Sequence, residues 1–304
     1  MANEVGDNLY NILHSDEANK EEEIKNIIVS TDSDTRVSAH HYYDSVYDTK
    51  LDEDIKQNTE SHFRDIVRDL FLDPLEYDAK QIEKAFKFFS KDDKNIYEIL
   101  TARPPWYIEE LKKVYKNKYG REFQSDIEKN FSGDFKKNLI TLLNTKRVEN
   151  ENPNHNQCAN WAKTLEKTAP INWATNERIF KEIFAQRSPE ELVLIGRYYK
   201  QDTGKNFLDV VEKDLTGKVR ALFREILYNT INPNELFAEK LKNSLEGLGT
   251  NTHLLNRVVV SRSDIDMKDI RDMYLYKYKN DLIEDISNDT EGQYKDLLVY
   301  LAKK

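Results

Sequence analysis

The sequence contains one unit four times, and this repetition limits its fold more than any other feature. An apolar segment ends at Thr31, Arg103, Arg187 and Arg262, which are separated by 72, 84 and 75 positions. A second marker keeps the same intervals, at Ser61, Gly133, Gly217 and Gly292. Four units in register predict a repeat protein in which neighbouring units complete each other's core.

Each unit ends in an apolar stripe at positions i, i+4 and i+7: Phe63, Val67 and Leu70; Phe135, Leu139 and Leu142; Val219, Phe223 and Ile226; Tyr294, Leu298 and Leu301. This spacing buries one face of a helix and no face of a strand. No segment shows a convincing strand alternation, and only seven prolines and nine glycines interrupt the chain. We therefore predict an all-α fold with about five short helices in each unit.

The intervals divide the chain into repeat I (1–72), repeat II (73–145), a connector (146–157), repeat III (158–230) and repeat IV (231–304). The extra length falls in a polar stretch around Asn150 and Pro153. Such stretches are typical of loops. We expect this one to connect two halves of the chain, each made of a pair of repeats.

The amino-acid composition limits the classes of partner that this protein can bind. The net charge of −9 argues against direct binding of nucleic acid or phospholipid, so an anionic target would need a bridging cation. Cys158 is the only cysteine, which excludes an internal disulfide and a cysteine-based zinc site. The sequence has neither a spanning apolar run nor a signal-peptide pattern, so we expect a cytoplasmic protein.

Repeat IV carries Gly247-Leu248-Gly249-Thr250, then Val258 to Ser263, then Asp285 to Thr290. This sequence resembles an annexin repeat, and repeat II is similar at Ile99 to Arg103 and Tyr115 to Arg121. The resemblance implies a curved right-handed superhelical disc of four annexin-type repeats, with calcium loops on its convex, membrane-facing side. Repeat I is more divergent, and the loss of standard ligands resembles the alpha-giardins, a divergent protist branch.

Calcium binds six to eight oxygen ligands, and a glycine-rich loop can supply backbone carbonyls. The carbonyls of Leu245, Gly247 and Gly249 are the candidates in repeat IV. The family resemblance assigns the completing carboxylate to Asp289, 42 residues after Gly247. Leu248 would then contact the membrane. The alternative is that the glycines end one helix and Asp289 caps the next.

The same 42-residue offset tests the other repeats. Repeat III keeps an acid, Asp214, with carbonyl candidates at Pro170, Asn172 and Ala174 and Trp173 as a membrane contact or, alternatively, a packed core residue. Repeat II has Phe88 and Ser90 at the glycine positions and Asn130 at the acid position. Repeat I has Asp16 in the loop and Asn58 at the acid position, so we expect neither repeat to form a standard site.

Three carbonyls and one carboxylate leave a bound calcium ion with net positive charge that a lipid phosphate can neutralise. We therefore expect calcium-dependent, reversible binding to anionic phospholipid membranes, peripherally on their cytosolic face. The alternative is a structural, cytoskeleton-associated or membrane-skeleton protein that acts through protein contacts. The six histidines form no metalloprotease motif, and no nucleotide-binding loop appears, so we expect no enzymatic activity.

Overall fold

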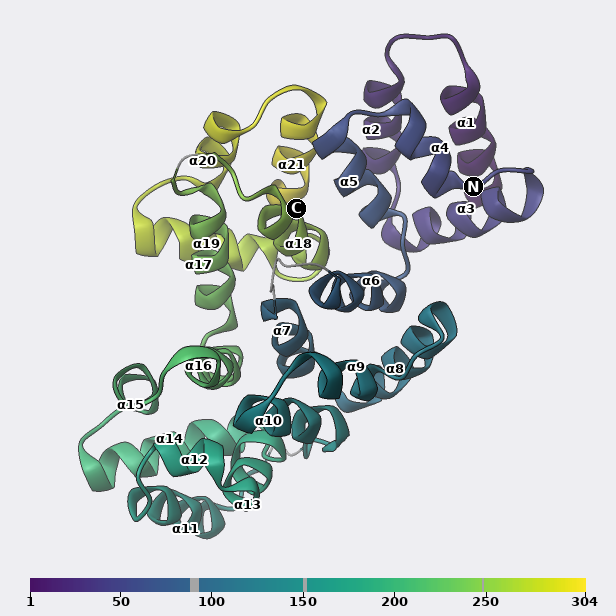
Figure 1. Ribbon diagram of the computed structural model, residues 1–304. Coiled ribbons are helices and arrows are strands. Elements are labelled where there is room, and N and C mark those ends of the chain that lie inside the picture. The colour runs from purple at the N-terminus through teal and green to yellow at the C-terminus, as the bar shows by residue number, and fades with distance from the viewer. Residues whose placement is uncertain (88–92, 150–151, 248) are drawn as a thin grey trace. The chain divides into compact units, whose positions relative to one another are not determined.

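The computed structural model describes residues 1–87, 93–149, 152–247 and 249–304, and within these ranges every regular element is a helix (Figure 1). Repeat I contains α1 (Ala2–His14), α2 (Lys20–Ser30), α3 (Ser33–Val46), α4 (Leu51–Asn58) and α5 (Ser61–Leu70). Repeat II contains α6 (Pro74–Phe86), α7 (Lys94–Ala102), α8 (Pro105–Tyr119), α9 (Phe123–Asn130) and α10 (Gly133–Asn144).

Repeat III begins with α11 (His155–Glu166) and then has three short pieces, α12 (Ile171–Thr175), α13 (Glu177–Ile179) and the π-helical η1 (Phe180–Ala185). It ends with α14 (Pro189–Thr203), α15 (Phe207–Asp214) and α16 (Gly217–Ile231). Repeat IV contains α17 (Pro233–Leu245), α18 (Thr252–Arg262), α19 (Met267–Tyr278), α20 (Leu282–Asp289) and α21 (Gly292–Lys303). The all-α prediction is confirmed, and repeat III differs in the short helix α12 within its first loop and in a second helix made of α13 and η1.

The predicted stripes lie on the last helix of each repeat, α5, α10, α16 and α21, and all of their residues are buried except the half-buried Val219. Burying an apolar side chain of this size contributes about 1.5–3 kcal/mol. The stripes therefore hold each last helix against the core, as their spacing predicted.

A buried tyrosine also recurs. Its hydroxyl donates a hydrogen bond to a carboxylate of the fourth helix in three repeats: Tyr43 to Asp54 (2.6 Å), Tyr115 to Asp126 (2.7 Å) and Tyr274 to Asp285 (2.6 Å). Burial raises the pKa of each tyrosine, and the hydrogen bond to the carboxylate raises it further. Repeat III has Tyr199 but Val210 at the acid position. This bond fixes the fourth helix beside the third.

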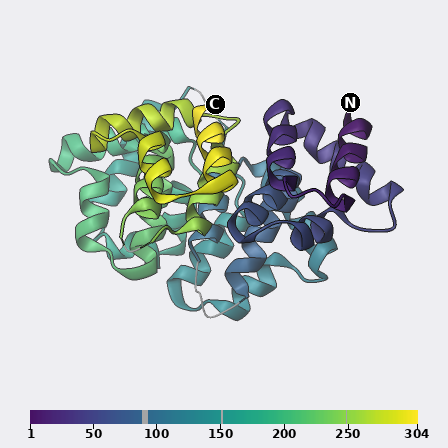
Figure 2. The same ribbon diagram turned by 90° about the horizontal axis from the view of Figure 1, so that it is seen from above.

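The chain forms two compact units, residues 1–77 with 234–304 and residues 78–233. Unit 1 therefore combines repeats I and IV and holds both chain termini (Figures 1 and 2). Unit 2 combines repeats II and III. The expected pairing of sequence halves is wrong, because repeat I buries its apolar surface against repeat IV and repeat II against repeat III.

The connector lies inside unit 2 and does not separate two halves. The Val148 amide donates to the Gln186 carbonyl (2.7 Å), and Arg147 donates to the Phe184 carbonyl (3.1 Å). Burial lowers the pKa of the Arg147 guanidinium to about 10. These contacts dock the described part of the connector onto the end of η1.

In unit 1, α2 and α5 of repeat I pack against α21, and α5 also packs against α18. The hydroxyl of Tyr300 donates to the Val29 carbonyl (2.8 Å), and the buried Arg36 guanidinium lies 3.7 Å from the Asp264 carboxylate. Apolar and polar contacts together join repeats I and IV, although these two repeats are more than 150 residues apart in sequence.

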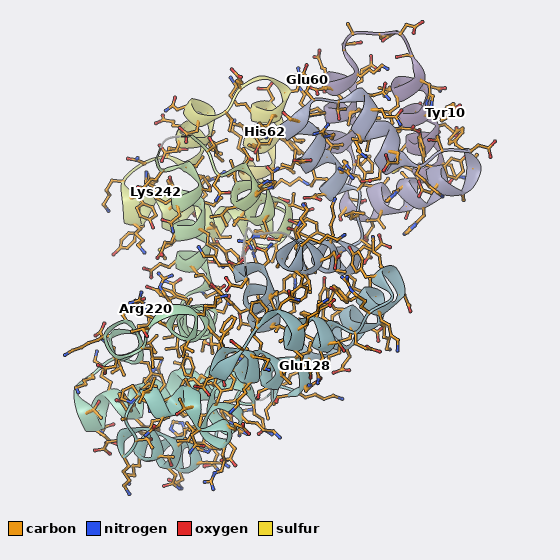
Figure 3. All side chains as sticks on the ribbon, viewed as in Figure 1. Tyr10, Glu60, His62, Glu128, Arg220 and Lys242 are labelled. Carbon is orange, nitrogen blue, oxygen red and sulfur yellow. The ribbon has the colours of Figure 1, made fainter. Side chains whose placement is uncertain are left out.

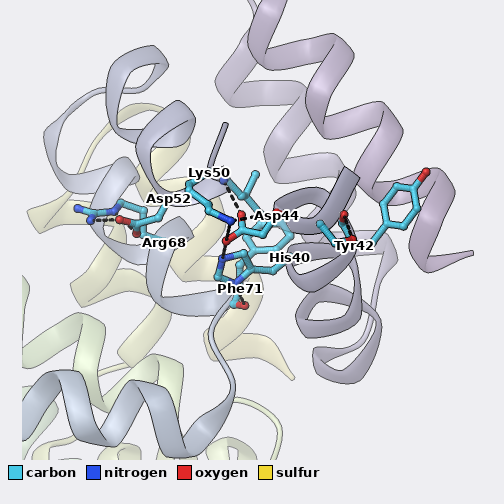
Figure 4. Close-up of polar contacts among 9 residues, drawn as sticks. His40, Tyr42, Asp44, Lys50, Asp52, Arg68 and Phe71 are labelled. Carbon is cyan, nitrogen blue, oxygen red and sulfur yellow. Dashed lines mark hydrogen bonds and ion pairs between the residues drawn. The ribbon is translucent and has the colours of Figure 1, made fainter. Parts of the chain in front are cut away.

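Polar contacts also link α3, α4 and α5 within repeat I (Figure 4). His40 is hydrogen-bonded to the Phe71 carbonyl (3.1 Å), and Lys50 donates to the Asp44 carbonyl (2.9 Å). Arg68 donates two hydrogen bonds to Asp52, at 2.6 and 2.5 Å. Repeat I is therefore held by its own side-chain network as well as by its core.

Candidate calcium site

The loop between α17 and α18 begins at Leu245, the last residue of α17. The Leu245 side chain is buried in the core of unit 1, which fixes the position of its carbonyl. The last four carbonyls of a helix have no partner within the helix and carry the negative end of its dipole. The first predicted ligand therefore lies at a helix end that favours a cation.

Two glycines shape the loop. Gly247 has φ +112° and Gly249 has φ +91°. Residues other than glycine rarely adopt this backbone conformation. A Cβ atom at either position would meet nothing within 4 Å, so glycine is required for the backbone conformation and not for space. The predicted membrane contact, Leu248, lies outside the described residues.

The acid predicted to complete the site lies beside this loop. Asp289 is the exposed last residue of α20. The Thr250 hydroxyl donates to the Asp289 backbone carbonyl at 2.9 Å. The fold therefore brings the glycine loop and the acid together across 39 residues of sequence.

The residues behind Asp289 fix α20. Asp285, one turn earlier, accepts the Tyr274 hydroxyl and lies 3.4 Å from the Lys242 ammonium group. Lys242, which is labelled in Figure 3, also lies 3.6 Å from the Glu246 carboxylate in the loop. Asp285 is thus engaged within the fold, whereas Asp289 lies at the exposed end of the same helix.

A cavity of about 680 Å³ within unit 1 is lined by Thr250 and Asp289 on repeat IV and by Glu60 and His62 on repeat I. Glu60 and His62 are labelled in Figure 3. The His62 ring lies 5.7 Å from that of Tyr294. Among residues 1–87, 93–149, 152–247 and 249–304, no group of three or more His, Cys, Asp or Glu side chains is suited to a metal. A cation at the repeat IV loop would therefore depend mainly on backbone oxygens.

The predicted carbonyls of repeat III already accept hydrogen bonds within the fold, and their binding of calcium stays a prediction. The Pro170 carbonyl accepts the Trp173 amide (3.0 Å), the Asn172 carbonyl accepts the Asn176 amide (3.0 Å), and the Ala174 carbonyl accepts the Asn138 side chain (3.2 Å). Without glycines, this loop forms the short helix α12, and helical carbonyls point along the axis instead of converging. Asp214 is the exposed last residue of α15.

For Trp173 the structure shows the packed arrangement, and its contact with a membrane stays a prediction. The Trp173 side chain is completely buried. Its indole nitrogen donates to the Leu165 carbonyl (3.3 Å), and its ring packs on Phe184, Tyr199 and Phe207 with centroids 5.6–5.9 Å apart. The exposed apolar side chain of α12 is that of Ile171, which is 51% exposed.

Repeats I and II have asparagine at the position where repeats III and IV have aspartate. Asn58 and Asn130 each donate a side-chain hydrogen bond back to the carbonyl four residues earlier, at 2.9 and 2.8 Å. Asp16 is exposed at the repeat I loop, whereas Phe88 and Ser90 of repeat II lie outside the described residues. The sequence reading missed Lys20, whose ammonium group bonds both Leu13 and Asn58.

The annexin family model matches residues 77–142, 162–226 and 236–301, which correspond to repeats II, III and IV. The chain belongs to the annexin family. Repeat I, which lies outside these three ranges, has the same order of five helices as repeats II and IV.

Mouse annexin A6 is 33% identical over 302 residues, covering 99% of this chain and 45% of the relative. Mouse annexin A3 is 31% identical over 93% of this chain and 87% of its own length. The chain thus spans about half of one relative and most of the other.

The solved structure of annexin III has a TM-score of 0.93 at 28% identity and covers 100% of this chain and 94% of its own. A calcium-bound alpha-14 giardin shares the fold, with a TM-score of 0.81 at 16% identity. Annexins bind calcium and acidic phospholipids. No helix in the described part of the chain is long and apolar enough to cross a membrane.

Proposed function

We propose that this annexin binds anionic phospholipid membranes reversibly and only with calcium, through one principal site in repeat IV. The ligands are the carbonyls of Leu245, Gly247 and Gly249 and the carboxylate of Asp289. The observation that carries the proposal is the pair of positive-φ glycines in a loop whose Thr250 is hydrogen-bonded to Asp289.

The charges of the site explain why calcium is needed. The chain carries a net charge of −9 and repels an anionic surface. When bound, calcium supplies a positive centre, because three neutral carbonyls and one carboxylate neutralise only half of its charge. The loop residues hold the cation and leave its outer positions to water or to a lipid phosphate. We place the protein at the anionic, cytosolic membrane face on this basis.

The other repeats have smaller roles in this proposal. Repeat III keeps Asp214 but uses its loop carbonyls internally, and Ile171 is the apolar side chain that this loop would present to a membrane. Repeats I and II have asparagine at the acid position. Removing calcium ligands from repeat IV should therefore remove most of the calcium response.

Sedimentation with phosphatidylserine vesicles tests the proposal, with Asp289→Ala compared against Glu284→Ala. Glu284 is an exposed acid on the same helix, so this control removes equal charge. The wild type and the control should pellet with calcium and be released by chelator. Asp289→Ala should need about tenfold or more calcium, because loss of a charged ligand costs at least about 1.4 kcal/mol.

Two results would contradict the proposal: pelleting that ignores both calcium and chelator, or an Asp289→Ala variant with the calcium requirement of Glu284→Ala. The absence of pelleting in calcium as well as in chelator would favour the alternative, a cytoskeletal or membrane-skeleton role through direct protein contacts.

A further inference from the structure

The two loops that would hold calcium in repeat IV are also adjacent in repeat I, where a lysine joins them. The Lys20 ammonium group donates to the Leu13 carbonyl at 2.9 Å and to the Asn58 side-chain oxygen at 2.8 Å. Leu13 lies in the last turn of α1, and Asn58 is the last residue of α4. A positive charge therefore bridges a helix-end carbonyl and the residue at the acid position.

When the repeats are aligned, Lys20 occupies a position at which repeats III and IV have asparagine. Lys20 lies 38 residues before Asn58, as Asn176 lies before Asp214 and Asn251 before Asp289. Asn176 and Asn251 are N-caps whose side chains accept amides of the following helix. In repeat I the N-cap Asn19 makes no such bond, and Lys20, the half-buried first residue of α2, reaches back to the loops instead.

The two changes in repeat I are chemically matched. A divalent ion held by carbonyls needs a carboxylate to offset its charge. A monovalent ammonium group has three donors and needs only acceptors, which a carbonyl and a neutral amide oxygen supply. Lysine with asparagine in repeat I thus joins the same two loops that calcium with aspartate would join in repeat IV, through the Leu13 carbonyl, which corresponds to that of Ser244 beside Leu245.

We propose that the Lys20 ammonium group is a built-in substitute for calcium, which holds the α1–α2 loop of repeat I against the end of α4 at any calcium concentration. Repeat I is then a permanently bridged loop pair that does not take up calcium. The comparison with repeat IV rests on the proposed function, whereas the bridge itself requires neither calcium nor membrane.

Thermal unfolding and hydrogen exchange of the full chain in chelator test the bridge, with Lys20→Met compared against Lys56→Met. Lys56 forms an exposed ion pair with Glu53 on α4, and such pairs contribute little. Lys20→Met should lower Tm by about 2 to 5 °C, since it removes two charge-assisted hydrogen bonds. Amides of residues 15–19 and 58–60 should exchange about tenfold faster, and calcium should not restore them.

A second variant, Asn58→Asp, should raise Tm equally in chelator and in calcium, because the new carboxylate pairs with Lys20. The inference is overturned if Lys20→Met behaves like Lys56→Met, or if Asn58→Asp stabilises the chain only in calcium. Both measurements are made without vesicles, so their failure is distinct from failure of the repeat IV proposal.

Discussion

Replacing Trp173 by alanine distinguishes a core role from a membrane role for this side chain. The ring is completely buried among Phe184, Tyr199 and Phe207, and its nitrogen donates to Leu165. Truncating a buried tryptophan costs about 3–5 kcal/mol through lost contacts and the cavity left behind. For a unit of this size that loss corresponds to a Tm decrease of about 6 to 20 °C.

Differential scanning calorimetry in chelator measures this effect, and Trp106→Ala is the matched control. Trp106 is 62% exposed, so its loss should leave Tm within about 2 °C of the wild type. A Trp173→Ala variant with unchanged Tm and weakened vesicle binding would refute the reasoning. That result would place the ring at the membrane surface and favour the membrane-contact interpretation.

Two further predictions concern the glycine loop and the tyrosines. Gly249→Ala forces a side chain into φ +91°, at a strain of about 1–2 kcal/mol, so calcium binding measured by titration calorimetry should weaken by about fivefold or more. Gly204→Ala, which also places a side chain at a positive φ (+73°) but in repeat III, should lower Tm without changing calcium affinity; an equal calcium effect in both variants would contradict this. Burial and the Asp285 hydrogen bond raise the pKa of Tyr274 above its unfolded value of about 10, so the resulting stability is complete below about pH 10 and is lost as pH rises further. Between about pH 9 and 11 the Tm of Tyr274→Phe should therefore fall less than that of the wild type. If Tm falls equally with pH in both proteins, Tyr274 does not contribute to the pH dependence of stability.

The sequence by itself determined the elements and the candidate ligands of repeat IV. Stripe spacing is a local property of a helix, so residues such as Leu139 and Leu298 could be assigned to the core before any packing was known. The glycine requirement is local as well, and Gly247 and Gly249 both have the predicted unusual backbone. The pairing of Gly247 with Asp289 came from the family resemblance, and the Thr250 contact supports it.

Tertiary structure decided everything that depends on which surfaces meet. Repeat I pairs with repeat IV because distant helices bury complementary faces, which the polar connector did not reveal. Trp173 is in the core, and the repeat III carbonyls are engaged, because the loop without glycines continues as the helix α12. Lys20 reads as an ordinary solvated charge until the ends of α1 and α4 meet around its ammonium group. Whether a charged side chain bridges two loops depends on distances in space, and sequence spacing alone does not set those distances.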